Sequence, residues 1–195
     1  MVKKVLIADL VEMNIIGGQI TSRIEAKDAS EKHNTLKVLI PKAISNGRVN
    51  PLELATLDVK IGVDSKRITQ EGDIVMKLST PYDACIITKE DEGLLVPSFC
   101  VIIKNVPNYI LKEYLVAYLN SKACSIQIKA LVTGATIAIL SSGQIKKISV
   151  PVPKLNVQKE IASTYVEGIE KLKLLEKINR LEKEYLDSRF LEMED

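Results

Sequence analysis

Short apolar runs separated by turn-forming residues make up the chain as far as about residue 153. These runs are rich in Val and Ile, which favour strands, and pairs such as Asn46-Gly47, Asn50-Pro51 and Thr80-Pro81 separate them. The pattern predicts β-strands over residues 36–40, 73–78, 84–88, 98–104 and 148–152.

A helical pattern interrupts the strands after Pro107. Apolar residues recur at intervals of three and four between Ile110 and Leu119, which indicates a helix with one buried face. We expect this helix to have Asn108 as its N-cap and to continue to about residue 131. The strands and the helix together predict a compact α+β domain with a β-sheet core over residues 1–153.

The last part of the chain, residues 154–195, has a different pattern. No Pro follows Pro153, and apolar residues at helical spacing alternate with charged ones, which predicts one helix of about 37 residues and about 55 Å. That length exceeds the roughly 30–40 Å diameter of a domain of about 150 residues. We therefore favour a coiled-coil-like contact with another helix over the alternative of a helix folded back on its own domain. The apolar stripe consists of Ile161, Tyr165, Ile169, Leu172, Leu174, Ile178, Leu181 and Tyr185.

Composition places the chain among ordinary folded proteins. It has 195 residues, of which 46% are hydrophobic and 27% are charged. No run approaches the ~18 apolar residues of a membrane span, and the N-terminus lacks the apolar core of a secretory signal, so we expect a cytoplasmic protein. The three cysteines have no CxxC spacing, which predicts reduced, buried thiols rather than disulfides or zinc ligands.

Groups that could carry catalysis are sparse. His33 is the single histidine, and the sequence holds neither a GxxxxGK[ST] phosphate loop nor a strand-GxGxxG-helix unit. Four carboxylates lie in turn-like segments without the recurring spacing of acid-base pairs, namely Asp58, Asp64, Asp73 and Asp83. We predict a non-enzymatic chain with no catalytic, cofactor or metal site of its own.

The net charge of +2 is unevenly distributed. Residues 1–153 carry 19 Lys/Arg and 15 Asp/Glu, whereas residues 154–195 carry 8 and 10. A surplus of this size permits binding to a nucleic acid without requiring it. The pairs Lys66-Arg67 and Lys146-Lys147 are interpreted as ordinary exposed residues.

The junction between the two patterns is the most informative segment. A strand ends in Val150-Pro151-Val152-Pro153, which stiffens the chain, and Asn156 is expected to cap the long helix. This segment resembles the end of a target recognition domain in the specificity subunits of type I restriction-modification systems. Glu71–Val75, Val96–Val101 and Tyr114–Leu119 resemble elements that precede it in that family. The matching residues of the junction are Gly134, Ala135, Thr136, Leu140, Ile148, Val150, Pro151, Pro153, Leu155, Gln158, Ile161 and Ala162.

The resemblance implies a DNA-specificity role. Residues 1–153 would be the recognition domain, and residues 154–195 the helical spacer that pairs subunits and docks a modification methyltransferase. S-adenosylmethionine, ATP and Mg²⁺ would be held by partner subunits, which include a restriction subunit where the system has one. Family members typically carry two recognition domains and two long helices, so one of each implies a homodimer that reads a bipartite target. A helix-mediated assembly adaptor without DNA binding stays open as the alternative.

Three polar clusters are candidates for contact with double-stranded DNA, through base edges in the major groove and through phosphates. In each case the alternative is an ordinary solvated turn. The first cluster is Lys42, Ser45, Asn46 and Arg48; the second is Lys77, Ser79, Thr80 and Tyr82; the third is Lys129, Thr133, Gly134 and Thr136.

Overall fold

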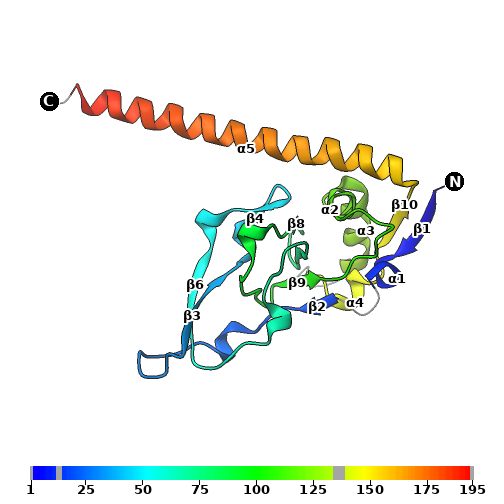
Figure 1. Cartoon of the computed structure of the whole chain (residues 1–195), viewed down its shortest axis with the longest axis horizontal. Helices are drawn as coiled ribbons and strands as arrows, with labels where there is room; N and C mark the ends of the chain where they lie inside the picture. Colours follow the sequence, from blue (N-terminus) through cyan, green and yellow to red (C-terminus); the bar gives the residue numbers. More distant parts are fainter. Residues whose placement is uncertain (1, 12–14, 134–138, 194–195) are drawn as a thin grey trace.

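Figure 1 shows the computed structural model of the chain, which describes residues 2–11, 15–133 and 139–193. A mixed α+β globule lies along one side of a long C-terminal helix, which confirms the predicted fold class. The strands are β1 (Lys3–Leu6), β2 (Ile15–Gly17), β3 (Asn34–Val38), β4 (Ile44–Ser45), β5 (Arg48–Val49), β6 (Ala55–Val59), β7 (Ile74–Lys77), β8 (Ala84–Ile86), β9 (Cys100–Ile103) and β10 (Ser149–Val152). The helices are α1 (Ile7–Val11), α2 (Lys112–Leu119), α3 (Lys122–Val132), α4 (Ser142–Ile145) and α5 (Leu155–Leu191).

The centre of the globule is a four-stranded antiparallel sheet in the order β2-β9-β7-β8. Every residue of β7 and β9 is buried, because apolar clusters cover both faces of the sheet. Ile74 and Ile103 face a cluster that contains α2, whereas Val75 and Ile102 face a second cluster beneath the β4–β5 hairpin. The predicted strands over residues 73–78, 84–88 and 98–104 are confirmed.

Three two-stranded ribbons surround this sheet. β3 pairs with β6, β4 pairs with β5, and β1 pairs with β10, so that the start of the chain lies beside the junction. The β4–β5 turn is formed by Asn46 and Gly47, both with positive φ, as expected for an Asn-Gly hairpin turn. The predicted strands over residues 36–40 and 148–152 are confirmed, whereas β1, β4, β5 and β6 were not predicted from the sequence.

The prediction of a single helix up to residue 131 is wrong. Two helices, α2 and α3, replace it, because Asn120 turns its side chain to the backbone of β8. Its Nδ2 donates to the Ala84 carbonyl at 2.8 Å and its Oδ1 accepts from the Ala84 amide at 2.8 Å. Ser121 then caps α3 through the Cys124 amide. The N-cap of α2 is Leu111 rather than the predicted Asn108.

The predicted long helix is confirmed as α5, with 37 residues, although its N-cap is Lys154 rather than Asn156. Its first half packs on α2, where Ala162 is buried and Tyr165 is partly buried. Its C-terminal end extends past the globule (Figure 1), and every described residue from 170 onward is exposed. The first half of the helix therefore folds back on its own domain, whereas the coiled-coil-like contact with another helix stays a prediction.

Candidate nucleic-acid interface

The side chain of Gln158 fixes the start of α5 on the globule. It is 1% exposed, and its Oε1 accepts from the Leu111 amide at 3.0 Å. Its Nε2 donates to the carbonyls of Tyr109 at 3.1 Å and Pro153 at 3.0 Å. These bonds join the end of the Pro-x-Pro segment, the N-terminus of α2 and α5, so the Gln of the junction motif sets where the long helix leaves the domain.

A groove of about 930 Å³ separates α5, α2 and the β4–β5 hairpin. The hairpin closes one side of it, and an added Cβ on Gly47 would lie 2.3 Å from the Tyr165 hydroxyl. Arg48 forms an ion pair with Glu176 of α5, and Asn46 Nδ2 donates to the same carboxylate at 3.4 Å. Two members of the first predicted cluster, Asn46 and Arg48, thus contact the long helix.

The other members of the first cluster lie at the surface of the globule. Lys42 is exposed and pairs with Glu53 at 2.6 Å, and Ser45 is partly buried in β4. An ion pair of this kind contributes little to stability and leaves the ammonium accessible to a phosphate.

The second predicted cluster is mostly internal. The Lys77 side chain is 8% exposed, and its Nζ donates to the Ile44 carbonyl at 3.0 Å and pairs with Asp83 at 2.7 Å. Tyr82 is 7% exposed and has a φ of 57°. Ser79 is partly buried and Thr80 is exposed. The ammonium of Lys77 supports the hairpin and the sheet, and this arrangement leaves it inaccessible to DNA.

The third predicted cluster lies at the end of α3. Lys129 and Thr133 are exposed, and Thr133 Oγ1 donates to the Lys129 carbonyl at 2.7 Å. Gly134 and Thr136 lie outside the described residues. Of the three lysines in the predicted clusters, Lys129 is the one for which no ion pair is found among the described residues.

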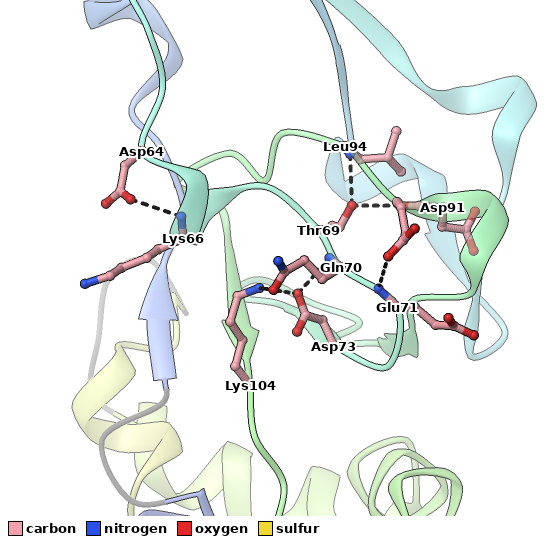
Figure 2. A network of polar contacts seen from close by, with 10 residues as sticks. Asp64, Lys66, Thr69, Gln70, Glu71, Asp73, Asp91, Leu94 and Lys104 are labelled. Carbon is pink, nitrogen blue, oxygen red and sulfur yellow. Dashed lines mark hydrogen bonds and ion pairs between the residues drawn. The ribbon is translucent and has the colours of Figure 1, made fainter.

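Figure 2 shows a polar network around the Gly-Asp-Ile segment that precedes β7. Asp73 accepts from the Gln70 amide at 2.9 Å and pairs with Lys104 Nζ at 2.5 Å, and both charged side chains are largely buried. Thr69 Oγ1 donates to the Asp91 carbonyl at 2.7 Å and accepts from the Leu94 amide at 2.9 Å. The Asp of this segment therefore ties the start of β7 to the end of β9 and to the preceding turn, which is a structural role.

The three cysteines lie buried in the described part of the chain. Burial raises the pKa of the Cys100 and Cys124 thiols to about 12 and raises that of Cys85 as well, so they stay protonated and unreactive at neutral pH. No group of three or more His, Cys, Asp or Glu side chains lies close enough to hold a metal among the described residues. None of the described helices is long and apolar enough to cross a membrane.

These features define a sheet-based α+β domain with polar surface loops, followed by a long helix that keeps about half of its apolar stripe uncovered. The sequence matches the family described as "Type I restriction modification DNA specificity domain" over residues 3–183. The chain therefore belongs to this family, as the junction motif indicated. No curated protein matches the sequence.

Solved structures of similar fold come from the same kind of system. One of them comes from work on complex assembly and conformational transition of the type I R-M system. It matches 90% of the present chain with a TM-score of 0.65 and 12% sequence identity. The HsdS subunit from Thermoanaerobacter tengcongensis gives 0.64 at 12% over 90%, and the S subunit from M. genitalium gives 0.52 at 14% over 92%. This chain spans 43–44% of the length of those proteins.

Proposed function

We propose that this chain is a DNA-specificity component of a type I restriction-modification system. It binds one half of a bipartite duplex target in the cytoplasm and directs a partner adenine methyltransferase to that target, together with a restriction subunit where one is present. The match to the DNA specificity domain over residues 3–183 carries this proposal. Residues 1–153 act as the recognition part and residues 154–195 as the spacer. The chain itself contributes no catalytic group, and S-adenosylmethionine, ATP and Mg²⁺ are bound by its partners.

The uncovered half of α5 supports pairing of two copies. Leu174, Ile178, Leu181 and Tyr185 follow a four-three-four spacing and are 50–63% exposed. Such a stripe packs against another helix, and two identical chains form a twofold assembly. A twofold protein reads a palindromic target with a fixed gap between its half-sites. The same helices give the methyltransferase subunit a surface to dock on.

The structure changes which residues we propose for DNA contact. Asn46, Arg48, Lys77 and Tyr82 are engaged with α5 or with the core, so we do not retain them. We retain the other members of the three clusters, including the two that lie outside the described residues, namely Lys42, Ser45, Ser79, Thr80, Lys129, Thr133, Gly134 and Thr136.

Methylation mapping tests the proposed function. The chain is co-expressed with the modification subunit of its own system in cells that lack adenine methylation, and N6-methyladenine is mapped across the genome. We expect a methylated palindromic motif with two half-sites at one fixed spacing. A double variant, Ile178→Glu with Leu181→Glu, should abolish methylation and dimer formation, whereas Lys177→Glu with Lys183→Glu should not.

Two outcomes would contradict the proposal. A methylated motif that is a single continuous sequence would refute the half-site arrangement. Stable assembly with the modification subunit, but with no methylation and no DNA binding that weakens with salt, would favour the assembly adaptor.

A further inference from the structure

A long segment of the chain contains basic residues but no acidic ones. Residues 114–159 hold six lysines and no Asp or Glu, a net charge of +6, whereas the rest of the chain carries 21 Lys/Arg and 25 Asp/Glu. An even distribution would place about six acidic residues in a segment of that length. The small net charge of the whole chain therefore conceals a strong separation of charge along it.

The fold gathers this segment at one end of the molecule. Gln144 of α4 donates to the Leu131 carbonyl of α3 at 2.6 Å, and Gln127 of α3 bonds to the Ser149 backbone of β10. β1 pairs with β10 and adds two lysines. Figure 1 shows these elements and the start of α5 together at the end that carries the N-terminus. We call this surface the basic end; its lysines are Lys3, Lys4, Lys122, Lys129, Lys146, Lys147, Lys154 and Lys159.

The lysines of the basic end are accessible and uncompensated. All are exposed except Lys146, which is partly buried. Lys122 and Lys129 are seven residues apart on α3, so they lie on the same face of that helix. No ion pair involves a lysine of the basic end among the described residues, whereas Lys32, Lys42, Lys77 and Lys104 elsewhere in the domain each pair with an acid. Among the described residues around this end, the acidic ones are Asp9 of α1 and Glu160, which follows Lys159 in α5.

We propose that the basic end binds the phosphate backbone of duplex DNA and holds the recognition domain on its target independently of base sequence. This inference rests on the proposed function and goes further, because it assigns the phosphate contacts to one surface. Duplex DNA carries one negative charge per about 1.7 Å of its axis, so it can face lysines on several elements at once. An ammonium is a compact point charge suited to phosphate, whereas sequence reading relies on directional hydrogen bonds to bases.

The acidic last segment of a second copy of the chain is the other candidate partner, because residues 182–195 carry six Asp/Glu and two Lys/Arg. One helix end offers a narrow strip of charge, whereas the lysines of the basic end are spread over β1, α3, the segment between α4 and β10, and the start of α5. The spread of the lysines favours DNA, and the test below separates the two partners.

The test compares two variants with the same change in net charge. One carries Lys122→Gln, Lys129→Gln and Lys147→Gln at the basic end; the other carries Lys173→Gln, Lys177→Gln and Lys183→Gln on the exposed half of α5. The affinity of the intact chain for a fluorescent mixed-sequence 30-base-pair duplex is measured by anisotropy in ~25–200 mM KCl, the range over which phosphate contacts are screened. Circular dichroism checks folding, and light scattering reports the oligomeric state.

We expect the basic-end variant to bind about tenfold or more weakly at low salt. Its slope of log affinity against log salt should fall by up to about 2.7, or about 0.9 for each phosphate that a lysine no longer neutralises, while the α5 variant keeps the wild-type slope. Equal weakening of both variants, or an unchanged slope in the basic-end variant, would overturn the inference and leave the proposed function standing. A basic-end variant that loses dimerisation but keeps its DNA slope would assign the lysines to a second copy and also overturn it. A wild-type chain without salt-dependent binding would instead count against the proposed function itself.

Discussion

Replacement of Gln158 by Ala tests how the long helix is joined to the recognition domain. The wild-type amide makes three hydrogen bonds in a site that is 1% exposed, one to the Leu111 amide and two to the carbonyls of Tyr109 and Pro153. Alanine removes all three and leaves the backbone groups of these residues without that partner. The Leu111 amide loses the one hydrogen bond found for it among the described residues.

The size of the effect follows from these three bonds. A hydrogen bond of this kind contributes about 1 kcal/mol net, so three predict a loss of about 3 kcal/mol in the free energy of unfolding. For a protein of this length, each kcal/mol lowers the melting temperature by about 2–4 °C, so we expect a fall of about 6–12 °C. Gln158→Glu keeps the acceptor but buries a carboxylate in place of the two donated bonds. Burial raises the pKa of such a carboxyl above its unfolded value, so the cost of this variant should shrink as the pH is lowered.

Urea unfolding followed by circular dichroism measures the free energy. Asn156→Ala is the matched control, since Asn156 lies in the same first turn of α5 and is exposed, and the structure places the N-cap at Lys154 instead. We expect the control to change the free energy by less than about 0.5 kcal/mol, as is usual for exposed sites. A loss below about 1 kcal/mol for Gln158→Ala would refute the reasoning, and so would a loss of about 1 kcal/mol for the control, the typical cost of a removed cap.

Three further predictions concern two glycines, the buried thiols and the ion pair between Asp73 and Lys104. Gly47→Ala should destabilise the protein by about 1 kcal/mol or more, because Gly47 has a φ of 74° and lies close to α5. Gly168→Ala should stabilise α5 by up to about 1 kcal/mol, because no atom lies within 4 Å of the added Cβ. Thermal unfolding compares the two variants. All three thiols should resist a disulfide reagent at pH ~8 in the folded protein, because they are buried and burial raises the pKa of Cys124, for example, to about 12. All three should react once the protein is unfolded in denaturant. Rapid labelling of the folded protein would contradict this prediction. Asp73→Ala should cost about 3–5 kcal/mol in urea unfolding, because it leaves the Lys104 ammonium buried and unpaired, and a cost under 1 kcal/mol would show that solvent reaches the site.

Local patterns predicted the elements that depend on local sequence. The central strands followed from runs of Val and Ile, and α5 followed from an uninterrupted apolar stripe. β1 was missed because its four residues are mostly exposed and its partner, β10, lies at the far end of the domain. The break between α2 and α3 depends on Asn120 and its bonds to a distant strand, although Ser121 gave a local sign of a helix start.

The candidate DNA contacts were harder to predict, because a polar residue in a turn looks the same whether it faces solvent or another element. The pairing of Lys77 with Asp83 could have been inferred, since both residues flank one tight turn between adjacent strands. The pairing of Arg48 with Glu176 joins residues 128 positions apart, and neither residue stands out in the sequence. Pairings of this second kind depend on where α5 lies, which local spacing does not specify.

The two halves of α5 have the same sequence pattern but different surroundings. In the sequence, only the comparison of the helix length with the domain diameter indicated that part of the helix would not pack on its own domain. Ion pairs along the exposed half, such as Arg180 with Glu184, contribute about 0.3–0.5 kcal/mol each. Those contributions are small beside the stability that packing of an apolar face gives to a helix in a folded protein. Among the described residues, the exposed stripe therefore lacks the packing that stabilises the first half. This is why we make assembly through the second half of α5 part of the proposed function.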